Sequence, residues 1–187
     1  MKPFKTICFS SVGLFLALLF LSCGEDEKSI TPESIGPYTL KIIPDTTSVT
    51  LDDEVEVDIV VSNVEDLYAA ELKLIFNSDT TIGAGAVDVK KVVEGTFLSE
   101  SGAVTTFFIK EYPVGSGYLE INTSRAASSG VTSKEDQVLA TITFKGTAAG
   151  TTAVDWATTN LFDSTQPNGE LIDPDDFTTI GGQIIIE

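Results

Sequence analysis

The stretch Val55-Glu56-Val57-Asp58-Ile59-Val60-Val61 alternates apolar and acidic side chains over its first five positions. Successive side chains of a β-strand point to opposite faces, so this pattern predicts a strand with one buried and one solvated face. Similar short runs recur to the end of the chain, separated by clusters of Gly, Asn, Asp and Ser, and no stretch keeps a helical period. These runs are 39–43, 67–76, 105–110, 118–123, 138–145, 152–158 and 183–186.

About nine short strands at fairly regular spacing are typical of an all-β, two-sheet sandwich. The sequence therefore predicts one such domain over residues 38–187. We expect its core to hold the apolar side chains on one face of each run. They are Val57, Ile59, Leu72, Leu74, Phe76, Phe97, Phe108, Leu119, Ile121, Ala140, Ile142, Phe144, Trp156 and Ile184.

The composition restricts the possible functions. Acidic residues outnumber basic ones 28 to 11, which gives a formal net charge of −17 and makes a nucleic-acid partner unfavourable. There is no His, so the usual general base near neutral pH and the commonest metal ligand are absent. Both Cys residues precede position 24. We therefore expect no catalytic residue, no metal site and no cofactor in the folded part.

The first 22 residues have the pattern of a signal peptide. Lys2 and Lys5 precede an apolar run over 7–21 that is too short to span a bilayer comfortably. The run ends in Ser22 and Cys23. This ending resembles the lipobox of bacterial lipoproteins, in which the Cys is acylated and becomes the new N-terminus. The alternative is a plain secretory signal with a chance Cys.

Residues 23–37 are predicted to be the acylated Cys23 followed by a flexible tether, because they contain Pro and Gly and little apolar content. The acidic run Glu25-Asp26-Glu27 resembles the surface-export signal of Bacteroidetes lipoproteins; the alternative is a solvated tether. The expected location is thus the bacterial outer membrane, at the cell surface, with contact to the membrane through the lipid anchor only.

Five segments, in order along the chain, resemble the cohesin family. Leu67–Asn77 is similar to the third cohesin strand, which ends in an aromatic residue followed by Asp or Asn. Val93–Leu98 is similar to the cohesin turn in which Gly is followed by any residue, an apolar residue and Leu. Gly117–Ile121, Val138–Lys145 and Gly182–Ile186 resemble its sixth, eighth and closing strands. The resemblance implies a jelly-roll sandwich that binds dockerin modules.

The resemblance also implies which surface binds. Cohesins dock through one flat sheet that includes strands three, five, six and eight. Carried over by position, the protein-binding face consists of Ala69, Glu71, Tyr112, Glu120, Asn122 and Arg125. Alternation independently points Glu71, Glu120 and Asn122 away from the core. A dockerin holds calcium in its own loops, so the metal would belong to the partner.

Other readings remain open. Cohesins resemble some cellulose-binding modules, so a polysaccharide is a second possible ligand; Tyr68, Tyr112 and Tyr118 could stack on sugars, whereas Trp156 shares a strand face with Val154 and is expected in the core. An adhesin-type surface lipoprotein would share fold, anchor and face. Catalysis by paired carboxylates is disfavoured because nothing marks a cleft. The oxygen-rich loops 163–170 and 173–176 are interpreted as turns rather than calcium sites.

Overall fold

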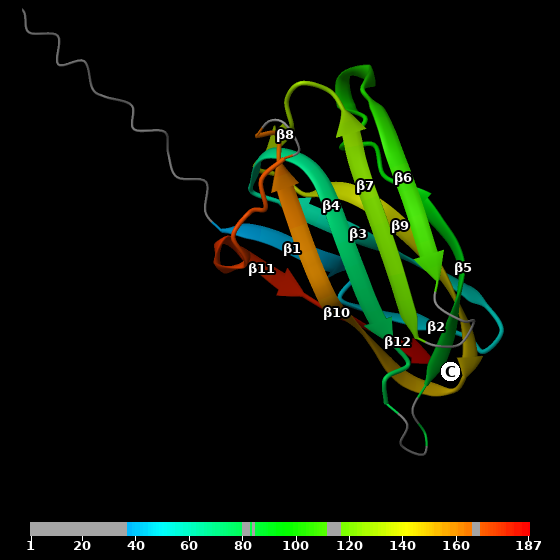
Figure 1. The fold of residues 1–187 in the computed structure, drawn as a ribbon. Coiled ribbons are helices and arrows are strands. Elements are labelled where there is room, and N and C mark those ends of the chain that lie inside the picture. Colours follow the sequence, from blue (N-terminus) through cyan, green and yellow to red (C-terminus); the bar gives the residue numbers. More distant parts are fainter. Residues whose placement is uncertain (1–36, 80–82, 84, 112–116, 166–168) are drawn as a thin grey trace, which may run out of the picture. The chain divides into compact units, whose positions relative to one another are not determined.

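Figure 1 shows a computed structural model of the chain, which describes residues 37–79, 83, 85–111, 117–165 and 169–187. Within these residues the chain forms twelve strands and two short 3-10 helices, η1 (Glu100–Gly102) and η2 (Pro174–Asp176). The strands are β1 (Tyr38–Ile43), β2 (Thr46–Val49), β3 (Glu54–Ser62), β4 (Val64–Phe76), β5 (Ala86–Glu94), β6 (Val104–Glu111), β7 (Tyr118–Ala126), β8 (Val131–Ser133), β9 (Gln137–Ala148), β10 (Gly150–Asp163), β11 (Phe177–Ile180) and β12 (Gly182–Ile186).

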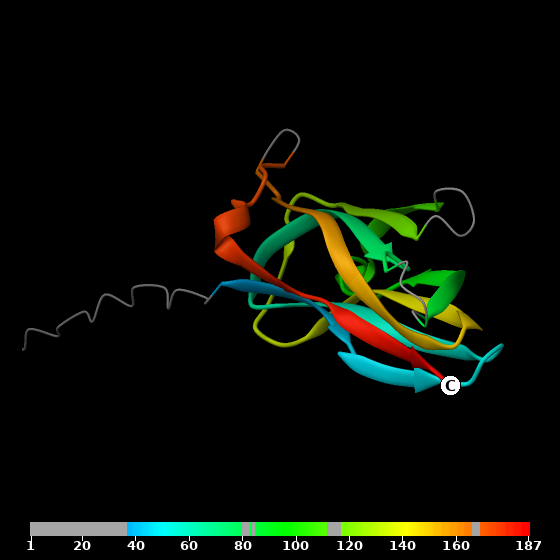
Figure 2. The ribbon, with the colours of Figure 1, turned by 90° about the horizontal axis from the view of Figure 1, so that it is seen from below.

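The strands form two sheets that stack as a sandwich, as predicted. One sheet has the order β11-β1-β3-β9-β5, and the other has β2-β12-β10-β4-β7-β6 with β8 beside β4. Strands β10, β4, β7 and β6 lie in front in Figure 1 and on the upper side in Figure 2. The eight runs read from the sequence miss four of the twelve strands. Strands β2, β8 and β11 have only three or four residues, too few for alternation to be recognised. The fourth, β5, lies at the edge of its sheet, and the adjacent Lys90 and Lys91, where its pairing with β9 shifts register, interrupt its alternation.

The core is nearly the one that the sequence predicts. Twelve of the fourteen expected residues are buried, and the rings of Phe76 and Phe144 meet edge to face across the two sheets at 5.3 Å between centroids. Phe108 is an error, because its side chain is 55% exposed and its neighbour Phe107 packs against the core instead. Trp156 is only half-buried: it packs against the core while its indole Nε1 donates to the carbonyl of Ile180 at 3.1 Å.

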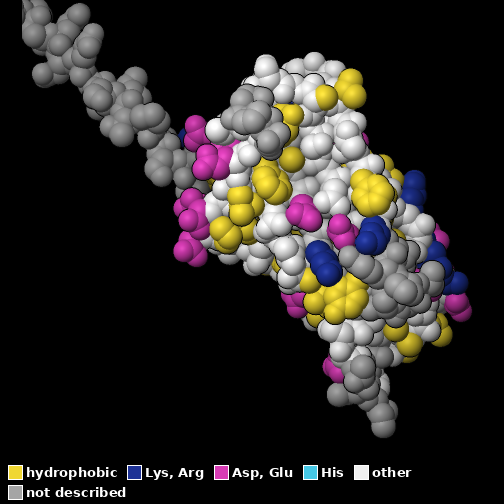
Figure 3. All heavy atoms as spheres, in the orientation of Figure 1, with side chains coloured by type: hydrophobic (Ala, Val, Ile, Leu, Met, Phe, Trp, Pro, Cys, Tyr) yellow, Lys and Arg dark blue, Asp and Glu magenta, His cyan; other side chains and the backbone are white. Residues whose placement is uncertain are grey.

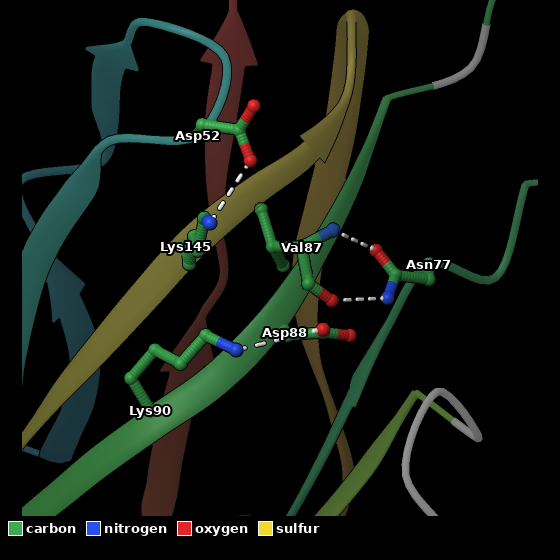
Figure 4. A network of polar contacts seen from close by, with 6 residues as sticks. All are labelled: Asp52, Asn77, Val87, Asp88, Lys90 and Lys145. Atoms are coloured by element: carbon green, nitrogen blue, oxygen red, sulfur yellow. Dashed lines mark hydrogen bonds and ion pairs between the residues drawn. The ribbon is translucent and has the colours of Figure 1, made fainter.

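The residue after the aromatic end of β4 has a structural role that links the sheets. Asn77 has a left-handed backbone with φ of 55°, a conformation that Asn tolerates better than most residues. Its side-chain Nδ2 donates to the carbonyl of Val87 at 2.6 Å, and its Oδ1 accepts from the Val87 N–H at 2.8 Å (Figure 4). The side-chain amide thus makes the same pair of hydrogen bonds with Val87 that the backbone of a neighbouring strand would make. It connects β4 of one sheet to β5 of the other.

Several predictions concern residues that the structure does not describe. The signal peptide over 1–22, Cys23, the tether up to 36 and Tyr112 all lie outside the described ranges. Among the described residues, no helix has the length and apolar character needed to cross a membrane.

Candidate functional site

The outward side chains of β10, β4, β7 and β6 form one continuous surface, here called the four-strand face. Antiparallel pairing aligns them in rows across the sheet. The first row, from β10 to β6, consists of Phe162, Ala69, Ser124 and Thr106. The second row consists of Asn160, Glu71, Asn122 and Phe108. The third contains Lys73, Glu120 and Lys110. Figure 3 views this face, on which hydrophobic, acidic and basic side chains lie close together.

Polar groups on the four-strand face are held in place by one another. Asn160 Nδ2 donates to Glu71 Oε2 at 2.9 Å, and Asn122 Nδ2 donates to Glu120 Oε1 at 3.2 Å. The Lys73 ammonium lies 5.3 Å from the centre of the Tyr118 ring, within the range of a cation–π contact. The face is therefore partly ordered before any partner arrives, which lowers the entropic cost of binding.

A depression of about 340 Å³ lies in this face and is here called the aromatic hollow. It is lined by Ala69, Ala70, Glu71, Thr106, Phe108, Asn122, Thr123, Ser124 and Phe162. The small side chains of Ala69 and Ser124 lie between the rings of Phe162 and Phe108, which project from strands on either side. Depressions lined by aromatic rings on an otherwise polar surface are characteristic of binding sites.

The opposite face of the sandwich is different in character. The outward positions of β3 that alternation selects are acidic and include Glu54, Glu56 and Asp58. On the neighbouring strand β9, Thr141 donates to Asp58 at 2.6 Å, and Lys145 forms an ion pair with Asp52 at 2.9 Å (Figure 4). Both β9 side chains therefore make polar contacts on this face.

The structure brings four of the six predicted face residues together. Ala69, Glu71, Glu120 and Asn122 all lie on β4 and β7 and contribute to the four-strand face. Phe108, which the sequence analysis assigned to the core, and Phe162, which it did not single out, both line the aromatic hollow. Their contribution depends on which strands pair and in which register, and no local pattern gives this information.

Arg125 does not reach the four-strand face. It lies within β7 on the same side as Leu119, Ile121 and Thr123, so its side chain points inward and is only 7% exposed. Its Nε and Nη1 atoms are buried and find no hydrogen-bond partner among the described residues. Burying unpaired donors costs free energy. The prediction that Arg125 belongs to the exposed binding face is therefore wrong.

The segment Val138–Lys145 also lies elsewhere than expected. The resemblance placed it in the docking sheet, but β9 pairs with β3 and β5 in the opposite sheet. Strand β10 occupies the place beside β4 instead. Strands β9 and β10 are both long, and their alternation does not distinguish the two sheets.

The two oxygen-rich loops have the contacts of turns. Asp163 Oδ1 accepts from the backbone N–H groups of Thr165 and Glu170, and Asp173 Oδ1 accepts from that of Asp175. Burial raises the pKa of Asp163, but the two backbone hydrogen bonds and one from the Thr165 side chain together outweigh it and hold the pKa below its usual value. In the described part of the chain, no group of three or more acidic side chains could hold a metal ion.

Trp156 lines a second, smaller depression of about 220 Å³ between β10 and β11. Phe177, Pro174 and several Thr side chains complete it. Both rings are half-buried and pack against the core. They therefore do not form the row of coplanar exposed rings that a sugar-binding platform requires.

Comparison with solved structures finds cohesin domains. The seventh type I cohesin of scaffoldin B from Pseudobacteroides cellulosolvens matches with a TM-score of 0.60 at 20% identity, over 81% of this chain and 92% of that chain. The sixth cohesin of scaffoldin B from Acetivibrio cellulolyticus, solved in complex with a mutant dockerin, matches with a TM-score of 0.61 at 18% identity, over 81% and 99%.

A non-cellulosomal cohesin from the archaeon Archaeoglobus fulgidus matches with a TM-score of 0.59 at 14% identity, over 81% of this chain and 92% of that chain. No family model and no curated relative matches the sequence. At these identities the similarity concerns the fold. The chain therefore has the cohesin fold, a two-sheet β-sandwich.

Proposed function

We propose that this domain is a non-catalytic module that binds a dockerin-bearing protein through the four-strand face. One observation carries the proposal: in a cohesin fold, the face of β10-β4-β7-β6 holds a pre-ordered polar network around an exposed aromatic hollow. Cohesins of similar fold have been solved in complexes with dockerins. The ordered resemblance of the sequence segments supports the same assignment.

The physical chemistry of the face suits a protein partner. Stable interfaces have aromatic anchors near their centre, surrounded by polar groups that fix orientation and exclude water. Phe108 supplies such an anchor, and Glu71 and Asn122 lie beside it in the same row. The formal net charge of −17 accelerates association with a basic partner surface. Calcium belongs to the dockerin rather than to this chain.

The proposal includes an anchor on the membrane. Acylation of Cys23 would attach the domain to the outer membrane, at the cell surface, through the tether that follows. Support for this part comes from the sequence, in which Ser22 and Cys23 end an apolar run and an acidic run follows. The partner proposed on the family resemblance is a polysaccharide-degrading enzyme that carries a dockerin.

A pull-down tests the binding function. Residues 34–187, which form one compact unit with every strand and the whole core, serve as bait for the secreted and membrane proteins of the source organism. We expect a dockerin-bearing protein to be retained with calcium and released by a chelator. Substituting Asn122→Arg on the four-strand face should abolish retention, whereas the matched control Thr147→Arg on β9 should not.

Failure of this experiment has a clear meaning. If no dockerin-bearing protein is retained in calcium, the docking function is wrong. If the bait instead binds an insoluble polysaccharide, the alternative of direct carbohydrate binding takes its place, and Tyr68 and Tyr118 become the residues to substitute.

A further inference from the structure

We infer that the aromatic hollow receives one large apolar side chain of the partner and so determines which dockerins this module accepts. The inference rests on the proposed function, because it names the chemistry of the partner at the same face. The fold is shared with the cohesin structures, whereas the hollow depends on the particular side chains of this chain.

The geometry of the hollow is that of a socket for a side chain. Its floor consists of Ala69 and Ser124, which pair with one another across β4 and β7. Phe162 on β10 pairs with Ala69. On β6, Thr106 pairs with Ser124, and Phe108 lies two residues further along the strand. The volume of about 340 Å³ is at the low end of the range of about 300–1,000 Å³ for ligand pockets. A depression of this size on a sheet surface has room for any single protruding apolar side chain.

The polar rim does not require a hydrogen-bonding guest. The Glu71 carboxylate already accepts from Asn160, and the Asn122 amide already donates to Glu120. A side chain seated on the Ala69 and Ser124 floor leaves these hydrogen bonds intact and the carboxylates at the rim in contact with water. Phe108, by contrast, is 55% exposed and gains from losing its contact with water. The hollow therefore favours an apolar guest over a polar one.

Charge restricts the guest further. Glu71 lies on the rim, and the chain as a whole carries a net charge of −17. A carboxylate that entered the hollow would be desolvated beside a like charge, which is an effective means of rejecting a wrong partner. The partner that fits is thus a dockerin with a Leu, Ile, Met or Phe side chain on a basic surface.

Filling the hollow tests the inference. Ala69→Leu places a larger apolar side chain on the floor, and Ala153→Leu makes the same change at an exposed position on β10 outside the hollow. Affinity for the purified dockerin that the pull-down identifies is measured by calorimetry, and thermal unfolding verifies that both variants fold. We expect Ala69→Leu to weaken binding about tenfold or more and Ala153→Leu to change it less than about twofold.

A second variant tests the same hollow by removing a side chain instead of adding a larger one. Phe108→Ala removes a wall without filling the floor, and it should also weaken binding about tenfold. If the dockerin binds the parent domain but Ala69→Leu and Phe108→Ala leave its affinity unchanged, the inference is wrong and the docking function stands. If no dockerin binds the parent domain, both are overturned.

Discussion

Replacing Asn77 should weaken the sandwich more than any single exposed substitution, because its amide joins β4 of one sheet to β5 of the other. Asn77→Ala removes both hydrogen bonds to Val87 and leaves the N–H and C=O of this fully buried residue without these partners. Each lost partner costs about 1–2 kcal/mol, within the range for a buried polar group left unsatisfied. An Ala with φ of 55° adds about 1 kcal/mol of backbone strain. The free energy of unfolding should therefore fall by about 3–5 kcal/mol.

The assay is urea unfolding of residues 34–187, followed through the fluorescence of Trp156, the only Trp in the sequence. Asn77→Gly removes the same hydrogen bonds without the strain of a left-handed Ala, so it should be about 1 kcal/mol less damaging. A loss below about 1 kcal/mol for Asn77→Ala would show that solvent or a rearranged backbone replaces both bonds, and the role given to Asn77 would be refuted.

Three further changes test other parts of the structure. Arg125→Met removes a buried cation whose Nε and Nη1 have no hydrogen-bond partner among the described residues, so it should raise the free energy of unfolding by about 1–3 kcal/mol in the same assay; a decrease would contradict the lack of partners. Asp66→Ala removes the carboxylate that accepts from the N–H of Gly130 and from the N–H and hydroxyl of Ser164, so melting should show a loss of about 2–4 kcal/mol, and an unchanged melting temperature would count against it. Cys23→Ser should shift the protein expressed in its bacterial host from the membrane pellet to the soluble fraction, whereas continued pelleting would contradict acylation at this residue.

Alternation in the sequence was enough to predict the sandwich and most of its core. In Val55–Val61 and Leu72–Phe76 the apolar positions repeat every second residue, and the structure buries that side of each run. The prediction failed at Phe107 and Phe108, because two adjacent aromatic residues point to opposite faces and neither hydropathy nor size distinguishes them.

Arg125 shows a different kind of error. The alternation of β7 from Leu119 through Ile121 and Thr123 continues to Arg125 and indicates an inward side chain. The position carried over from the cohesin resemblance instead assigned Arg125 to the binding face, although its side chain is buried. Strict application of the two-residue period would have placed it correctly.

The candidate site could be predicted only in part. Glu71, Glu120 and Asn122 were assigned to the outer face from their own strands. The aromatic hollow was not visible, since Phe162 and Ala69 are far apart in the sequence and meet only through the pairing of β10 with β4. Which sheet β9 and β10 join is likewise decided by contacts between distant segments, about which a local pattern carries no information.

The most direct test of the docking face is chemical-shift mapping of isotope-labelled residues 34–187 during titration with an unlabelled dockerin in calcium. Our account predicts that the largest changes fall on β4, β6 and β7, with Glu71, Asn122 and Phe108 at their centre. Changes concentrated on β3 and β9 of the opposite sheet, or no changes with any dockerin of the organism, would contradict it.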